Sequence, residues 1–270
     1  MARFHLIQID TVWENAQATC DALDRILESE KPVKDSLVVL PELFDVGFTM
    51  NAGCAVEHSE KTRDHLSNIA KRFGVHIIAG VARRCENFVE NQAVFIDPSG
   101  SEIGRFTKLH GFSLSGEDRA YRSGDRVVIW DWKVGGESIR IAPFICYDLR
   151  FPEIFRKAID LGAQAFVVIA NWPSTRCEHW NVLLKARAIE NQALVVAVNR
   201  IGSDPNLNYA GESQVIDPWG EVKAKADSYQ THLVHAFDSN VIASMRQCYP
   251  FVRDRRNPDA INQGHDKRPK

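Results

Sequence analysis

The sequence has 270 residues, of which 44% are hydrophobic and 25% are charged, as in globular proteins that bury a large core. Its formal net charge of −2 gives no electrostatic basis for binding nucleic acid or an anionic membrane. No apolar run reaches the roughly 20 residues of a membrane span and the N-terminus lacks a signal-peptide pattern, so we expect a cytoplasmic protein.

Strand-like and helix-like segments alternate along most of the chain. In the first half, the apolar pattern predicts helices at 12–27 and 61–73 and strands at 4–9, 36–40, 75–81, 91–96 and 102–107. In the second half, it predicts helices at 152–161 and about 177–191 and strands at 139–145, 165–170, 193–198, 211–216 and 221–226. This alternation is typical of α/β proteins.

A similar four-residue turn sequence occurs once in each half of the chain. Asp97-Pro-Ser-Gly100 and Asp217-Pro-Trp-Gly220 each stand between two predicted strands, which predicts two β-hairpins. Two similar halves predict two mixed sheets with helices outside, an α/β sandwich with pseudo-two-fold symmetry. We assign residues 1–250 to a single domain and the highly charged residues 251–270 to a C-terminal tail.

The cysteines are scattered, and none has the Cys-x-x-Cys spacing of many zinc sites. Because a secretory signal is also lacking, we expect reduced thiols, no disulfide, no metal and no cofactor. The six cysteines are Cys20, Cys54, Cys85, Cys146, Cys177 and Cys248.

Cys146 lies where the predicted strand 139–145 ends and a polar turn leads to the helix that begins at Pro152. A cysteine at such a turn has free backbone N–H groups nearby, which lower the pKa of a thiol and stabilise a developing oxyanion. An inert buried thiol is the alternative, since free cysteine is among the most buried residue types. The position makes Cys146 a candidate nucleophile.

Three charged residues stand at other places where strands end or loops begin. Glu42 follows a buried strand and has apolar neighbours, so partial burial would suit it to act as a general base. Lys108 closes the strand of a predicted hairpin, and Glu117 lies on a polar loop. Taken singly, each of these residues could equally be a solvated surface charge.

Taken together, three of these residues resemble the catalytic set of the nitrilase superfamily. That set is a glutamate after a strand, a lysine after a hairpin and a cysteine at a strand-to-helix turn. The resemblance covers nearly the whole chain, and its most specific motif, Cys146-Tyr-Asp-Leu-Arg-Phe-Pro-Glu153, looks like the Nit/omega-amidase branch. The segments Ala170-Asn-Trp-Pro173 and Asn199-Arg-Ile-Gly-Ser-Asp204 are similar to bacterial omega-amidases. The loop Gly111–Gly116 departs from that branch, at the place where the family selects its substrate.

The resemblance implies an αββα fold that pairs across a dimer interface into a four-layer αββα–αββα sandwich, and therefore a homodimer or a larger homo-oligomer. It also implies that Glu42, Lys108 and Cys146 form a catalytic triad, and that Glu117 is a second glutamate that holds the lysine. In this reading Glu42 moves the thiol proton and Lys108 stabilises the oxyanion, because a thiol at its ordinary pKa is only slightly ionised at neutral pH.

Three more residues are candidates for binding the substrate. The backbone N–H of Tyr147 can assist the lysine at the oxyanion. Arg150 can pair with a substrate carboxylate, or alternatively form a structural ion pair with Asp148 or Glu153. Trp172 can wall the pocket, or it can be ordinary core packing.

We therefore interpret the chain as an omega-amidase that acts on a small-molecule amide, 2-oxoglutaramate or 2-oxosuccinamate, through a cysteine thioester. Deaminated-glutathione amidase and N-carbamoyl-amine hydrolase are alternatives within the same superfamily. A non-catalytic scaffold with the same fold is the alternative from another class, and the intact set of three residues argues against it.

Overall fold

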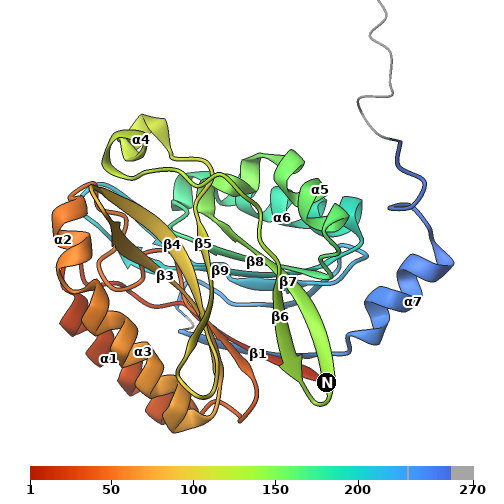
Figure 1. Cartoon of the computed structure of the whole chain (residues 1–270), viewed down its shortest axis with the longest axis horizontal. Helices are drawn as coiled ribbons and strands as arrows, with labels where there is room; N and C mark the ends of the chain where they lie inside the picture. The colour runs from red at the N-terminus through yellow and green to blue at the C-terminus, as the bar shows by residue number, and fades with distance from the viewer. Residues whose placement is uncertain (230, 257–270) are drawn as a thin grey trace, which may run out of the picture.

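The computed structural model describes residues 1–229 and 231–256, and it consists of two stacked six-stranded sheets with helices on the outside (Figure 1). The first sheet has the order β14 (His232–Phe237), β1 (Ala2–Ile7), β2 (Leu37–Val39), β3 (His76–Cys85), β4 (Phe88–Ile96) and β5 (Glu102–Thr107). The second has the order β13 (Val222–Lys225), β12 (Gln214–Ile216), β9 (Leu194–Asn199), β8 (Ala165–Ala170), β7 (Glu137–Ile145) and β6 (Trp130–Val134). The predicted α/β sandwich of two mixed sheets is confirmed.

Helices and short connecting elements complete the described fold. The α-helices are α1 (Ala16–Glu30), α2 (Ala52–Glu57), α3 (Ser59–Phe73), α4 (Glu117–Ala120), α5 (Pro152–Asp160), α6 (Cys177–Asn191) and α7 (Asn240–Cys248). The 3₁₀ helices are η1 (Ser113–Ser115), η2 (Cys146–Arg150) and η3 (Ser174–Arg176). A separate small hairpin is formed by β10 (Ile201–Ser203) and β11 (Asn208–Ala210).

Apolar side chains fill the spaces between these layers. Helices α1 and α3 cover the first sheet, and Leu23 and Leu66 belong to one buried cluster with the strand residue Ile77. Helices α5 and α6 cover the second sheet (Figure 1). Between the sheets, the rings of Phe4 and Trp132 lie 5.1 Å apart. Removal of this apolar area from water, at roughly 25 cal/mol per Å², is what drives the two sheets together.

Both sheets have the same arrangement of parallel and antiparallel strands, as the two similar turn sequences predicted. In the first sheet, β1, β2 and β3 are parallel, β14 is an antiparallel edge strand, and β4 and β5 continue as an antiparallel hairpin. In the second, β7, β8 and β9 are parallel, β6 is the antiparallel edge, and β12 and β13 form the hairpin. The two tetrads close the equivalent hairpins, with Gly100 at φ 78° and Gly220 at φ 82°, where glycine has no steric penalty.

Several element ends differ from the predicted ones. The first helix begins at Ala16 rather than at residue 12, because the Asn15 side chain accepts a hydrogen bond from the Ala18 N–H and caps the helix. The first strand covers 2–7 rather than 4–9. Strands β6 and β14, helix α7 and the β10–β11 hairpin were not predicted. Both strands are half-exposed sheet edges, whose mixed composition is a weak sequence signal.

The first residues of the predicted tail contact the domain. The Val252 N–H donates to Gln192 Oε1 at 3.2 Å, and Arg255 forms an ion pair with Asp160. Val252 also packs against the buried core. Residues 257–270 of the predicted tail lie outside the described residues.

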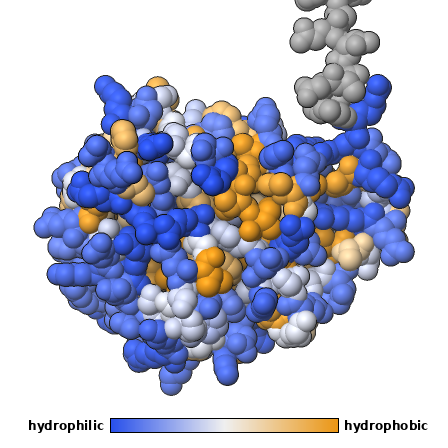
Figure 2. Space-filling view, viewed as in Figure 1, coloured by the Kyte–Doolittle hydropathy of each residue, from blue (hydrophilic) through white to orange (hydrophobic). Residues whose placement is uncertain are grey.

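The described surface is mostly hydrophilic on the face that Figure 2 shows, with an apolar patch near α5 and α6. Within the described part of the chain, no helix has both the length and the apolar character that crossing a bilayer requires.

A buried histidine pair joins the edge of the first sheet. His5 on β1 stacks on His232 on β14 with ring centroids 5.1 Å apart, and His5 Nδ1 lies 2.9 Å from His232 Nε2. Burial, followed by the charges of His232 and Arg3, lowers the pKa of His5 from 6.5 to about 4, and Glu30 offsets this only in part. The folded chain therefore keeps His5 neutral over a pH range in which the unfolded chain protonates it.

We expect this difference to make the free energy of unfolding fall as the pH is lowered from 6.5 towards about 4. The unfolded state binds the proton first in this window, so the contribution is complete above pH 6.5 and decreases by at most about 1.4 kcal/mol per pH unit below it. Urea unfolding at about pH 8 and about pH 5 measures the loss, which should be smaller in His5→Gln. Equal losses in both proteins would contradict this assignment.

Candidate active site

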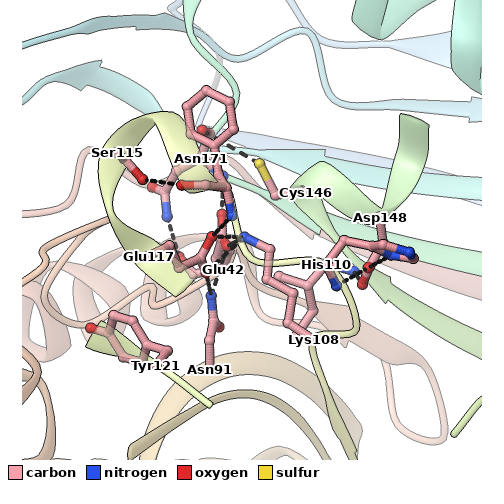
Figure 3. A network of polar contacts seen from close by, with 12 residues as sticks. Glu42, Asn91, Lys108, His110, Ser115, Glu117, Tyr121, Cys146, Asp148 and Asn171 are labelled. Atoms are coloured by element: carbon pink, nitrogen blue, oxygen red, sulfur yellow. Dashed lines mark hydrogen bonds and ion pairs between the residues drawn. The ribbon is translucent and has the colours of Figure 1, made fainter. Parts of the chain in front are cut away.

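The polar residues of the site come from four strand ends. Glu42 follows β2 and Lys108 follows β5 in the first sheet, whereas Cys146 follows β7 and Asn171 follows β8 in the second. Stacking of the sheets brings these ends together, and Figure 3 shows their side chains pointing toward one another. Glu117, the first residue of α4, joins them. The structure thus gathers all four residues that the sequence nominated for catalysis.

Glu42 is fully buried and uses both carboxylate oxygens. Oε1 accepts hydrogen bonds from Lys108 Nζ at 2.7 Å and from Asn91 Nδ2 at 2.8 Å. Oε2 accepts from the Asn171 N–H at 2.9 Å, and the Asn171 side chain donates back to the Glu42 carbonyl at 2.7 Å. These contacts hold the carboxylate in one position beside the Cys146 thiol.

Lys108 is 3% exposed and lies between two carboxylates. Its Nζ is 2.7 Å from Glu42 Oε1 and 2.8 Å from Glu117 Oε2, while Asn91 also donates to Glu117 Oε1 at 3.0 Å. Burial by itself would lower the pKa of the amine, but the two glutamates raise it above its ordinary value. Lys108 is therefore an ammonium ion at neutral pH, and Asn91 bridges the two carboxylates that pair with it.

The backbone at Cys146 is strained. Cys146 opens η2 with φ 45°, a left-handed conformation that costs a non-glycine residue roughly 1–3 kcal/mol. This bend places Sγ 3.7 Å from the Asn171 carbonyl oxygen, and the residue is 9% exposed. Strain of this kind persists only where the surroundings impose it, as at functional sites.

The expectation that the elbow lowers the pKa of Cys146 is wrong. Burial raises the pKa of this thiol well above its ordinary value, and the charge of Glu42 raises it further, while Lys108 lowers it only in part. At rest Cys146 is therefore a thiol rather than a thiolate. A thiol that attacks a carbonyl carbon needs a base to take its proton, and Glu42 is the carboxylate next to Cys146.

Close backbone packing against β3 positions Glu42. A Cβ atom added at Gly80 would lie 2.4 Å from Glu42 Cα and 2.7 Å from the Pro41 carbonyl oxygen. The Gly80 N–H donates to that same carbonyl at 3.0 Å. Only glycine permits this approach of two backbones.

We expect Gly80→Ala to destabilise the fold by about 1–3 kcal/mol through overpacking and to lower kcat by moving Glu42. Urea unfolding and a steady-state amidase assay measure the two effects. Gly53→Ala on the exposed part of α2 is the matched control, because its Cβ would lie 3.5 Å from Asn51 Oδ1, an ordinary van der Waals contact. The prediction fails if the two variants behave alike.

Another buried carboxylate, Asp148, connects the segment after Lys108 to the turn at Cys146. Asp148 Oδ1 accepts from the His110 N–H at 2.9 Å and lies 2.8 Å from His110 Nδ1, while Oδ2 accepts from the Ile145 N–H at 3.2 Å. His110 stands two residues after Lys108, and Asp148 stands two residues after Cys146. The His110 ring also stacks on Phe151 at 3.7 Å. Asp148 therefore fixes the elbow relative to the lysine.

A small cavity opens above the thiol, with a volume of about 30 Å³. Arg150 lies over the Trp172 ring at 4.9 Å and within 6.0 Å of the Tyr147 ring. Trp172 is both a wall of the cavity and packed in the core, at 2% exposure. The residues that line the cavity are Phe48, Lys108, Phe112, Cys146, Tyr147, Arg150, Asn171, Trp172, Pro173, Arg176 and Leu207.

The alternative role predicted for Arg150, a structural ion pair with Asp148 or Glu153, does not occur in the described residues. Asp148 is engaged by His110, and no ion pair joins Arg150 to Asp148 or Glu153 in the part of the chain that the structure describes. In the same described part, His, Cys, Asp and Glu side chains form no group of three or more that could hold a metal ion.

Sequence reasoning did not nominate Asn91, Asn171 or Arg176 for the site. Asn91 had a usable signal, because a polar side chain in an otherwise apolar strand needs a buried polar partner. Asn171 and Arg176 had none, since their roles depend on contacts with residues far away in the chain.

Comparison with known proteins agrees with this geometry. The sequence pattern of the carbon-nitrogen hydrolase family matches residues 5–247. The chain belongs to this family. Omega-amidase YafV of Yersinia enterocolitica is 36% identical over 92% of this chain and 94% of its own length. The 2-oxoglutaramate amidase of Bacillus subtilis (strain 168) is 34% identical over 92% of this chain and 95% of its own length.

A solved structure is similar over almost the whole length. XC1258 from Xanthomonas campestris, a CN-hydrolase superfamily protein with an arsenic adduct in its active site, superposes with a TM-score of 0.88. It is 33% identical, and the match covers 97% of this chain and 99% of that one. The predicted membership of the nitrilase superfamily and its omega-amidase branch is confirmed. The chain is a hydrolase that acts on carbon–nitrogen bonds other than peptide bonds.

Proposed function

We propose that this hydrolase is an omega-amidase that converts 2-oxoglutaramate or 2-oxosuccinamate into the dicarboxylate and ammonia. The observation that carries the proposal is the buried network of Glu42, Lys108 and Glu117 beside the Cys146 thiol, at the base of a small cavity. Relatives named omega-amidase and 2-oxoglutaramate amidase, aligned over 92% of the chain, support the choice of substrate class.

In the first half-reaction, Cys146 Sγ forms a bond to the amide carbon while its proton passes to Glu42. The carbonyl oxygen becomes an oxyanion, which the Lys108 ammonium and the Tyr147 backbone N–H stabilise. When the carbon–nitrogen bond breaks, Glu42 returns the proton to the nitrogen. Ammonia leaves, and the acyl group remains on the sulfur as a thioester.

In the second half-reaction, Glu42 takes a proton from water, and the resulting oxygen nucleophile attacks the thioester carbon. Lys108 stabilises the second oxyanion in the same position. The carbon–sulfur bond breaks, and the proton returns from Glu42 to Cys146. The acid is released and the thiol is regenerated, so each amide consumes one water molecule.

The shape and charge of the cavity support a short substrate with a carboxylate. Phe48 and Phe112 narrow the space above Cys146. Arg150 faces this space and is not paired with a carboxylate of the described chain, so it can bind the acid end of a 2-oxo acid bidentately. A cationic carbamoyl amine would meet repulsion at the same place.

Release of ammonia from 2-oxoglutaramate, L-glutamine and a carbamoyl amine tests this proposal. We expect strong turnover of the keto-amide alone. Turnover of another amide in its place would retain the amidase chemistry and overturn the substrate. Inertness toward all three, together with slow alkylation of Cys146, would favour the non-catalytic scaffold.

One observation favours a second candidate, a deaminated-glutathione amidase. A groove of about 480 Å³ adjoins the cavity and shares Phe48, Phe112, Arg176 and Leu207 with it. The groove gives a longer amide room beyond the loop Gly111–Gly116, whose Leu114 is 88% exposed. Deaminated glutathione added to the same assay decides between the candidates by their kcat/KM values.

We also propose a homodimer in which two αββα units stack into four layers. Exposed apolar side chains on α6, Val182 at 53% and Ile189 at 52%, support pairing through the outer helices. Light scattering after size-exclusion chromatography tests this, and a monomeric mass would contradict it. A cytoplasmic location stays a prediction.

A further inference from the structure

Arg176 is an arginine of the cavity that the mechanism leaves without a role. It ends η3, and its guanidinium lies 5.5 Å from the centroid of the Phe112 ring. It lines both the inner cavity above Cys146 and the outer groove, so it stands where the two meet. Among residues 1–229 and 231–256, no carboxylate or other acceptor contacts this guanidinium.

Arg150 lines the same cavity and is also without a carboxylate partner in the described chain. Its guanidinium donates a hydrogen bond to His179 Nδ1 at 3.3 Å. By contrast, the positive charge of Lys108 at the base of the cavity is neutralised by two glutamates. The mouth of the cavity therefore carries uncompensated positive charge, which attracts anions.

A single tryptophan holds both arginines. The Trp172 indole N–H donates to the Arg176 carbonyl at 2.8 Å, and the face of the same ring lies under Arg150 at 4.9 Å. The platform under Arg176 is fixed as well, because the Phe112 N–H donates to Glu117 Oε2 at 2.7 Å. Guanidinium groups held against aromatic rings have less side-chain entropy to lose when they bind a carboxylate.

We propose that Arg176 is a specificity-determining residue that, together with Arg150, binds the carboxylate at the end of the substrate opposite the amide. The inference rests on the proposed amidase function and names a residue that would give it a preference for short anionic amides. A carboxylate held at the mouth positions the amide carbon over Cys146, and an amide without this charge loses that anchor.

Succinamate and butanamide test the proposal, because they differ by a carboxylate in place of a methyl group. We expect wild type to prefer succinamate, and Arg176→Gln to lower the ratio of the two kcat/KM values by roughly 10–100-fold, mainly through KM for succinamate. Arg176→Lys should restore part of the ratio. Arg122→Gln is the matched control and should leave it unchanged, since Arg122 lies over Phe88 at 5.1 Å outside this cavity.

Calorimetric binding of succinamate to Cys146→Ala, with and without Arg176→Gln, provides a readout that needs no turnover. We expect the second substitution to weaken binding by a similar factor, and the difference to shrink at high salt. Equal affinities, or equal losses on both amides, would overturn the role of Arg176. Failure of wild type to hydrolyse any amide would instead overturn the proposed function, while the binding comparison would still test Arg176.

Discussion

Replacing Cys146 with alanine is expected to reduce amide hydrolysis by roughly 10⁴-fold or more, because it removes the sulfur atom that forms the proposed thioester. The change deletes one sulfur atom and leaves the hydrogen bonds of Glu42 to Lys108, Asn91 and Asn171 in place. The free energy of unfolding should therefore change by no more than about 1 kcal/mol. Ammonia release and urea unfolding measure the two quantities.

Cys177→Ala on α6 is the control for this substitution, because Cys177 is another partly buried thiol that does not line the cavity. It should retain wild-type activity. Residual turnover of more than a few per cent in Cys146→Ala would exclude the thioester route.

Lys108→Met is expected to have the largest combined effect on activity and stability. Loss of the ammonium removes an oxyanion donor, which costs about 2.7–4 kcal/mol of transition-state stabilisation, or roughly 10²–10³-fold in kcat. It also leaves Glu42 and Glu117 buried together without a cation, with only Asn91 between them. Breaking a buried ion pair in this way costs about 3–5 kcal/mol of stability.

The double variant Lys108→Met/Glu117→Gln separates these two effects. Removing one of the two facing carboxylates relieves their repulsion, so we expect it to recover a large part of the lost stability and none of the lost activity. Urea unfolding and single-turnover kinetics measure the recovery. A double variant as unstable as Lys108→Met would show that charge repulsion is not the cause.

Local patterns placed three of the candidate catalytic residues at strand ends, and the resemblance to the nitrilase superfamily then nominated them as a set. The strand ends before Glu42, Lys108 and Cys146 are recognisable because short apolar runs stop at polar turns, and this pattern depends only on neighbouring residues. The two Asp-Pro-x-Gly tetrads likewise identified the hairpins and the repeated sheet plan. Elements with weak local patterns, such as the edge strands β6 and β14, could not be found in this way.

The roles of the supporting residues depend on contacts between distant parts of the chain. Asn171 reaches Glu42 across 129 positions, and Gly80 matters because two backbones approach each other when β3 packs beside β2. The predicted pKa of Cys146 was wrong for the same reason. A turn with free N–H groups predicts a lowered pKa, whereas burial next to Glu42 in the folded chain raises it.

The sequence by itself determined the family and the sandwich of two mixed sheets, because local periodicity predicts the strands and the motifs resemble those of the nitrilase superfamily. That resemblance also nominated Glu42, Lys108, Glu117 and Cys146. Only the tertiary structure decided how the charges are balanced. It neutralised Lys108 with two glutamates, and it left Arg150 and Arg176 without a carboxylate partner in the described chain. Charge balance and burial are sums over atoms that folding brings together, so no local pattern could contain them.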